Sequence, residues 1–154
     1  MSKIKKNVSK IVLVVNDIDK ALNNFKIMFD FKDIDIVIAS NDNKDPNVQT
    51  IYQGQQISGA VKIANLVMDN LIIELIQPID KHSPWGKFKE ENGEGIFSIV
   101  FDTNDFQKTR EMLDKNEFDL FHFGSYVGGK YAYFNTKDKV GTTLCIQELQ
   151  KQSE

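Results

Sequence analysis

Apolar positions in the first half of the chain alternate between strand-like and helix-like spacing. Residues 11–15 are aliphatic and predict a strand that stops at Asn16 and Asp17, whose side chains can cap a following helix. From Asp17 to about Asp30 the apolar residues recur at helical spacing, with polar residues on the other face. Three further strands are predicted at residues 34–38, 60–67 and 71–77.

The same order of patterns returns in the second half. Residues 96–101 predict a strand, Asn104 and Asp105 form a second capping pair, and helical spacing follows as far as Leu113. Three more strands are predicted at residues 118–123, 131–134 and 142–147. The segment between the halves is rich in proline and glycine around a charged middle, which predicts a connector and not a core element.

The two halves align at one constant offset, with Lys10 on Ser98 and Asp17 on Asp105. This alignment indicates an internal repeat of a whole βαβββ unit. We therefore predict an α+β fold in which two βαβββ modules form a curved mixed sheet around a cavity. A single domain is expected over residues 1–154, with module one at about 8–78, the connector at about 79–95 and module two at about 96–149.

Alternate residues of each strand indicate which face of the sheet a side chain occupies. One face is uniformly apolar in several strands, as with Phe97, Ile99 and Phe101, and should contact the helices. The opposite face carries polar or reactive side chains in four strands: Lys10, Glu74, Ser98, Thr143, Cys145 and Gln147. A curved sheet would gather these side chains in one cavity, where we expect the functional site.

Composition and charge exclude several classes of partner. A net charge of −3 and a pI near 5.4 provide no field that attracts phosphates, so nucleic acid is not expected. The apolar runs are about strand length, well short of the roughly 20 residues of a membrane helix, and no membrane partner is expected. The N-terminal residues lack a secretory pattern, and we expect a cytoplasmic protein. Cys145 is the only cysteine, which rules out an intramolecular disulfide.

Several short segments resemble one protein family. They comprise Ile73–Pro78, Ser83-Pro84, Phe88, Gly93 and Gly95-Ile96. In order and spacing they resemble methylmalonyl-CoA epimerases of the glyoxalase, bleomycin resistance and dioxygenase superfamily, also called vicinal oxygen chelate proteins. Residues 14–21 and 141–148 are similar to the opening and closing segments of that family. The resemblance implies the fold given above and a homodimer.

Members of this superfamily commonly hold a divalent metal with four residues, one on the first and fourth strand of each half. The resemblance places Lys10, Glu74, Ser98 and Cys145 at these positions. A protonated lysine has no lone pair and a neutral serine is a poor ligand, so no metal cofactor is expected, and Glu74 is the ligand if one binds. We expect the Lys10 ammonium to take the place of the cation and to pair with Glu74.

The sequence is compatible with two main functions. The first is metal-free binding of a small organic ligand, either an acyl-thioester or a flat aromatic compound. The second is a lyase or isomerase that resembles methylmalonyl-CoA epimerase or glyoxalase I, with Glu74 as general base or metal ligand. A third, an interaction module, has no motif behind it. The residues expected around the cavity are Lys10, Glu74, Ser98, His122, Tyr131, Thr143 and Cys145.

Overall fold

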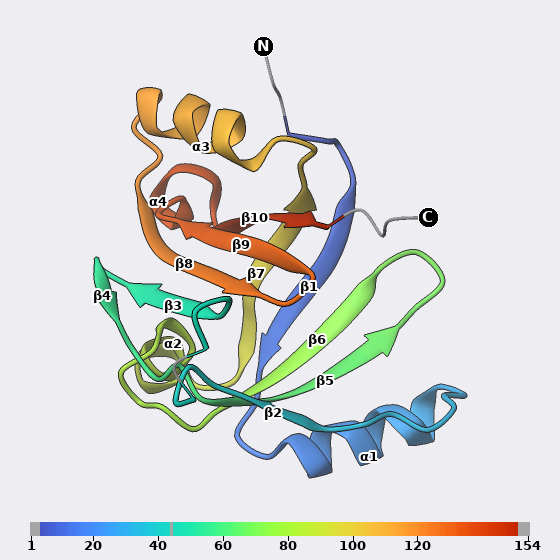
Figure 1. Ribbon diagram of the computed structural model, residues 1–154. Helices are drawn as coiled ribbons and strands as arrows, with labels where there is room; N and C mark the ends of the chain where they lie inside the picture. The colour runs from blue at the N-terminus through green and yellow to red at the C-terminus, as the bar shows by residue number, and fades with distance from the viewer. Residues whose placement is uncertain (1–3, 44, 151–154) are drawn as a thin grey trace.

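The computed structural model describes residues 4–43 and 45–150 and contains a ten-stranded mixed sheet that curls into a half-barrel (Figure 1). Module one contributes β1 (Val8–Val14), α1 (Ile18–Met28), β2 (Val37–Ala39), β5 (Val61–Val67) and β6 (Ile72–Pro78). Module two contributes β7 (Gly95–Asp102), α3 (Phe106–Lys115), β8 (Leu120–Tyr126), β9 (Gly129–Phe134), α4 (Lys137–Val140) and β10 (Thr143–Leu149). The remaining elements are β3 (Gln49–Tyr52), β4 (Gln55–Gln56) and α2 (Pro84–Asn92). The predicted α+β fold of two βαβββ modules is confirmed.

The strand order β2-β5-β6-β1-β7-β10-β9-β8-β3-β4 places the first strands of the two modules side by side. β1 and β7 pair antiparallel, while β6 runs parallel to β1 and β10 runs parallel to β7. Val12 therefore lies opposite Glu74 in module one, and Val100 lies opposite Cys145 in module two. The four strands that carry Lys10, Glu74, Ser98 and Cys145 are thus neighbours at the centre of the curved sheet.

The two module helices begin in the same way and cover the outer face of the sheet. The Asp17 carboxylate accepts a hydrogen bond from the Lys20 backbone N–H at 3.1 Å, and Asp105 accepts one from the Lys108 N–H at 3.0 Å. α1 packs Ile18 and Leu22 against β5 and β6, and α3 packs Phe106 and Leu113 against β9 and β10. Both helices therefore lie on the outer side of the curved sheet (Figure 1).

The segment predicted as a connector contains a helix that belongs to the core, so the prediction that it has no core role is wrong. Trp85 in α2 is 4% exposed and packs with Val12, Val100 and Tyr133. The Ser83 hydroxyl caps α2 by accepting the Gly86 N–H at 3.0 Å, and Pro84 occupies the first turn. A serine followed by proline is a helix start signal, because proline fits the first helical position.

A hairpin from module one extends the sheet of module two. β3 pairs antiparallel with β8, and β4 pairs with β3 across a turn at Gln53 and Gly54, both of which have positive φ. Neither strand is among those predicted from the sequence. Their effect is to close one side of the inner face, where Gln49 and Thr50 reach the cavity.

The register of β1 and β7 shifts between Val12 and Leu13. Phe97 packs at the inner face, where its ring centroid lies 4.9 Å from that of Tyr133 and 5.3 Å from that of Phe88 in α2. The prediction that Phe97 shares the outer face with Ile99 and Phe101 is therefore wrong. A β-bulge changes the alternation of side chains at one point of a strand, which a simple period of two does not anticipate.

Candidate functional site

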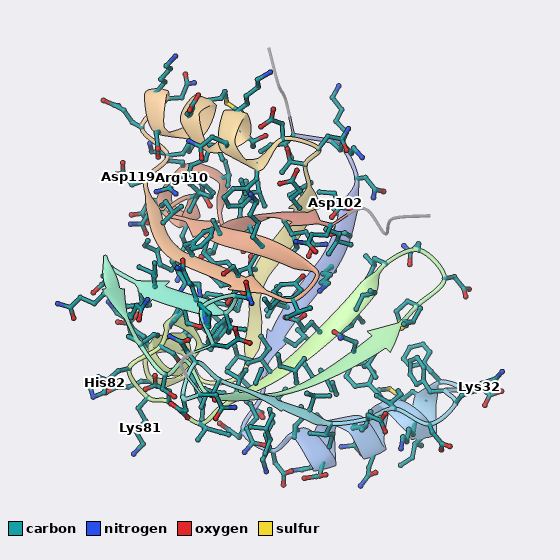
Figure 2. The ribbon with its side chains drawn as sticks, viewed as in Figure 1. Lys32, Lys81, His82, Asp102, Arg110 and Asp119 are labelled. Atoms are coloured by element: carbon teal, nitrogen blue, oxygen red, sulfur yellow. The ribbon has the colours of Figure 1, made fainter. Side chains whose placement is uncertain are left out.

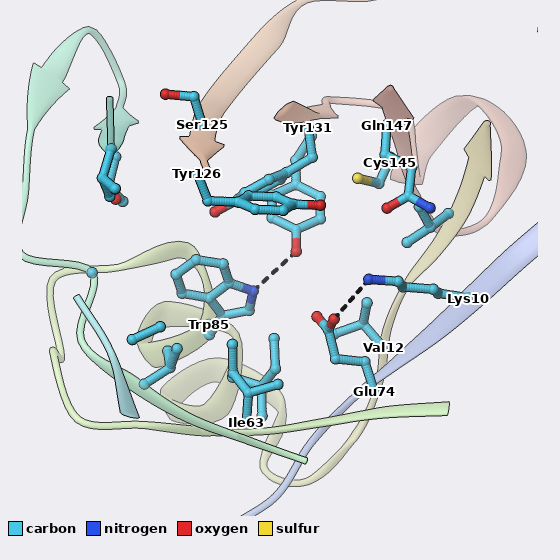
Figure 3. Close-up of a pocket in the computed structure, with 18 of the residues that line it drawn as sticks. Lys10, Val12, Ile63, Glu74, Trp85, Ser125, Tyr126, Tyr131, Cys145 and Gln147 are labelled. Carbon is cyan, nitrogen blue, oxygen red and sulfur yellow. Dashed lines mark hydrogen bonds and ion pairs between the residues drawn. The ribbon is translucent and has the colours of Figure 1, made fainter. Parts of the chain in front are cut away.

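The inner face of the sheet encloses a cavity of about 330 Å³ (Figure 3). Its aliphatic lining comes mainly from Val12, Val61, Ile63, Ile76 and Val100. Aromatic side chains gather at one end around Trp85, and polar side chains at the other around Lys10 (Figure 3). The site is therefore an apolar chamber with two chemically distinct ends.

An ion pair between two neighbouring strands of module one, β1 and β6, forms the polar end. Lys10 Nζ on β1 lies 3.2 Å from Glu74 Oε2 on β6, and the two side chains are 18% and 15% exposed. Burial lowers the pKa of Lys10, but the negative charge of Glu74 and their hydrogen bond outweigh it, and the pKa lies above its ordinary value. The lysine is therefore a permanent cation at neutral pH, and the pairing expected from the sequence is present.

Module two places Ser98 and Cys145 at the other two predicted ligand positions, and these residues do not form an ion pair. Ser98 is fully buried, and its hydroxyl donates a hydrogen bond to the Thr143 carbonyl oxygen at 2.8 Å. Neither Ser98 nor Thr143 is among the residues that line the cavity. Cys145 does line it, and burial raises the pKa of its thiol, so that the group is neutral and a weak nucleophile at neutral pH.

These residues do not fit a divalent metal. An ammonium has no lone pair, the Ser98 hydroxyl is engaged by the backbone, and a neutral thiol is a poor ligand. Glu74 alone offers a hard anionic oxygen. Within the described residues, no group of three or more His, Cys, Asp or Glu side chains could hold a metal ion.

The aromatic end is tied together by its own hydrogen bonds. Trp85 Nε1 donates to the Tyr133 hydroxyl at 3.1 Å, and the Tyr131 hydroxyl lies 3.0 Å from His122 Nε2. Tyr131 lies flat on β8 because Gly124 has no side chain there; a Cβ atom at Gly124 would stand 2.3 Å from the tyrosine ring. The tryptophan N–H and the Tyr131 hydroxyl thus have partners within the protein, while the Tyr133 hydroxyl accepts from Trp85 and can still donate its own proton. Otherwise this end presents mainly ring surface.

His122 lies behind this aromatic wall and does not line the cavity. Its ring centroid is 5.1 Å from that of Trp85 and 5.4 Å from that of Tyr133. Burial lowers the pKa of His122 to about 3, which keeps the imidazole neutral. The other histidine, His82, is exposed on the outside of the fold beside Lys81 (Figure 2).

Of the residues expected from the sequence, the structure brings four to the cavity: Lys10, Glu74, Tyr131 and Cys145. Other lining residues include Trp85, Tyr126, Tyr133 and Gln147. Gln147 shares the predicted inner face, and its Nε2 donates to Asp102 Oδ1 at 2.8 Å and to Ser9 Oγ at 3.1 Å. Tyr133 lies two residues after Tyr131 on the same strand, so alternation predicts that both side chains share one face. Trp85 lies in a helix that was not predicted from the sequence.

Removal of Lys10 should destabilise the protein because it leaves the Glu74 carboxylate without its partner. We expect Lys10→Met to lower the free energy of unfolding by roughly 1–3 kcal/mol, and Lys10→Met with Glu74→Met to recover part of that loss. Denaturant unfolding measures both. The more exposed pair Lys130–Glu148, at 3.6 Å, provides the control, since Lys130→Met should change stability by less than about 1 kcal/mol. An unchanged stability for Lys10→Met would show that the pair is simply solvated.

The buried imidazole of His122 should make stability depend on pH. Its pKa is lowered from 6.5 to about 3 in the folded protein, so the unfolded chain binds a proton that the folded chain does not. Stability is then full above about pH 6.5 and decreases as the pH falls toward 3, by up to about 1.4 kcal/mol per pH unit. Unfolding measured from about pH 5 to 7 should show a weaker slope for His122→Phe, and an unchanged slope for His82→Phe. Equal slopes for the wild type and His122→Phe would contradict this assignment.

Comparison with protein families places most of the chain in one group. Residues 9–134 match the family model of the Glyoxalase/Bleomycin resistance protein/Dioxygenase superfamily. Curated protein sequences give no match. In the described residues, no helix is long and apolar enough to cross a membrane.

Solved structures show the same fold at low sequence identity. Methylmalonyl-CoA epimerase from Mycobacterium tuberculosis is 18% identical, with a TM-score of 0.68, over 99% of this chain and 93% of that one. A hypothetical protein from Bacillus halodurans C-125 is 19% identical, with a TM-score of 0.68, over 97% and 99%. A variant of Streptomyces coelicolor methylmalonyl-CoA epimerase, in complex with 2-nitronate-propionyl-CoA, is 15% identical, with a TM-score of 0.66, over 97% and 100%.

At these identities the structural likeness establishes the fold and nothing finer. The family match, however, spans both modules, from β1 to the end of β9. The chain belongs to the glyoxalase/bleomycin resistance protein/dioxygenase superfamily.

Proposed function

We propose that this protein binds a small organic ligand in the cavity of its curved sheet, without a metal ion. One observation carries the proposal: the Lys10 ammonium lies 3.2 Å from Glu74, at positions where the family resemblance implies metal ligands. Because the Lys10 ammonium is part of the chain and neutralises the Glu74 carboxylate, this carboxylate does not require a metal ion as its partner. The remaining role for the cavity is to receive an organic molecule.

The shape and lining of the cavity support this role. A volume of about 330 Å³ lies at the lower end of the range for small-molecule sites. Such sites are mostly apolar and aromatic, with a few polar groups that orient the ligand. Here the apolar and aromatic walls surround one ion pair and several neutral polar side chains, which agrees with that description. The neutral polar residues are Ser40, Gln49, Thr50, Asn65, Ser125 and Gln147.

Structures of the same fold support an acyl-thioester as one ligand class. One methylmalonyl-CoA epimerase, 15% identical with a TM-score of 0.65, is solved in complex with methylmalonyl-CoA and NH4+. An ammonium cation and an acyl-thioester are therefore compatible with one protein of this fold. A flat aromatic compound is the other class, and the four aromatic side chains at the cavity favour it: Trp85, Tyr126, Tyr131 and Tyr133.

The second candidate function is that of an isomerase or lyase. Its support is the presence of a carboxylate and an ammonium in one chamber. Glu74 would remove a proton next to a carbonyl group, and Lys10 would stabilise the negative charge that forms on the carbonyl oxygen. Exchange of the C-2 proton of methylmalonyl-CoA with deuterated solvent, followed by NMR, would favour this function if wild type catalyses it and Glu74→Gln does not.

The homodimer and the cytoplasmic location are further parts of the proposal. Both are expectations from the sequence, and the homodimer follows from the family resemblance. Apolar side chains on the surface of module one give the homodimer some support: Ile27, Val37, Ile38 and Val67 are all more than half exposed. Light scattering on purified protein measures the mass in solution.

The single tryptophan offers a direct test of ligand binding. Trp85 is the only tryptophan in the chain, is 4% exposed and lines the cavity, so its fluorescence responds to what enters. We expect saturable quenching by at least one of indole, coumarin, 2-naphthol and propionyl-CoA, confirmed by calorimetry. Ile63→Phe narrows the cavity and should weaken that binding about tenfold or more.

The matched control places the same substitution far from the cavity. Ile27 in α1 is 82% exposed, and Ile27→Phe should leave the affinity unchanged. If no aromatic or acyl-thioester probe binds to wild type, or if Ile63→Phe binds as wild type does, the cavity is not the ligand site.

A further inference from the structure

We infer that the ligand of this cavity is an uncharged planar aromatic compound whose edge carries a carbonyl oxygen next to an N–H group, as in a carboxamide or lactam. The inference rests on the proposed binding function and specifies its ligand class. Three features of the site carry it: the charge balance of the polar end, the free hydrogen-bonding groups there, and the chemistry of the aromatic end.

The polar end is electrically neutral as a unit. Lys10 and Glu74 are the charged residues that line the cavity, and they neutralise each other at 3.2 Å. Cys145, Tyr126, Tyr131 and Tyr133 have raised pKa values because of burial, and they add no charge at neutral pH. An anionic ligand would make two negative groups share the Lys10 ammonium, and a cationic ligand would make two positive groups share the Glu74 carboxylate. Either ligand leaves one partly buried charge unbalanced.

The ion pair still offers one donor and one acceptor side by side. Of the three N–H groups of the ammonium, one bonds to Glu74 Oε2, and within the described residues Lys10 has no other hydrogen-bond partner. Glu74 Oε1 likewise accepts no hydrogen bond from the described residues. A carbonyl oxygen can accept from Lys10 while the adjacent N–H donates to Glu74 Oε1. A carboxamide or lactam edge satisfies both groups without changing the charge of the site.

The aromatic end presents ring faces, and two of its polar groups already have partners within the protein. The Trp85 N–H is bonded to Tyr133, and the Tyr131 hydroxyl is bonded to His122. Tyr126 reaches across the cavity mouth from the end of β8, and its hydroxyl is directed toward the Lys10 end (Figure 3). A flat ligand can thus place its ring among these side chains and its polar edge at the ion pair.

Three probes of nearly identical shape separate the charge classes: benzamide is neutral, benzoate is an anion and benzamidinium is a cation. Titration of wild type, followed by Trp85 fluorescence and calorimetry at neutral pH, should show benzamide binding at least about tenfold more tightly than either ion. Glu74→Gln leaves Lys10 as the only charge and should shift the preference to benzoate. Lys10→Met leaves Glu74 and should shift it to benzamidinium, and Lys130→Met, outside the cavity, should keep the wild-type order.

The outcomes separate this inference from the function on which it rests. If wild type binds benzoate or benzamidinium as tightly as benzamide, or more tightly, the inference that the ligand is uncharged is wrong. The cavity is still a binding site in that case. The same holds if none of the three binds while indole, coumarin, 2-naphthol or propionyl-CoA does. If no probe of either series binds, the proposed function fails as well. Should Lys10→Met not fold, the isosteric Glu74→Gln still tests the shift.

Discussion

The ion pair between Lys10 and Glu74 is the constraint on which the rest of the site depends. A carboxylate that is only 15% exposed in an apolar chamber requires a positive charge within contact distance. In the superfamily that charge is commonly a metal ion, which needs further ligands from the other module. Here the charge is attached to β1, and the other module supplies none: Ser98 bonds to the backbone and Cys145 is a neutral thiol. Because no further metal ligands are needed, the rest of the cavity lining is mainly apolar and aromatic.

This arrangement changes what the fold can do chemically. A bound metal draws oxygen atoms of a substrate toward its open positions and stabilises an enolate. An ammonium that is already paired with a carboxylate is a weaker electrophile, and the pair as a whole is neutral. It suits recognition of a neutral polar edge more than activation of an acidic proton. The aromatic end adds to this, since Trp85 and Tyr131 direct their polar atoms to Tyr133 and His122 and not to the ligand.

Much of the fold follows from local patterns in the sequence. The capping residues Asp17 and Asp105, and the repeat of strand and helix spacing, suffice to predict two βαβββ modules. Alternation along the strands places Lys10 and Glu74 on one face, and the family resemblance implies that they pair. What could not be predicted depends on long-range packing. Trp85 lies in a short helix whose apolar face is small, and β3 and β4 pair with module two although they belong to module one in sequence. The bulge that brings Phe97 to the inner face exists only because β1 and β7 pair.

The most direct test of the account is whether the site takes a metal ion. Elemental analysis of untagged protein, before and after incubation with Mn²⁺, Co²⁺, Ni²⁺ and Zn²⁺, measures this, with Glu74→Ala as the control for binding at the ion pair. Because the Lys10 ammonium already neutralises Glu74, the account predicts far less than one metal ion per chain in both proteins. Near-stoichiometric metal in wild type that disappears in Glu74→Ala would contradict it.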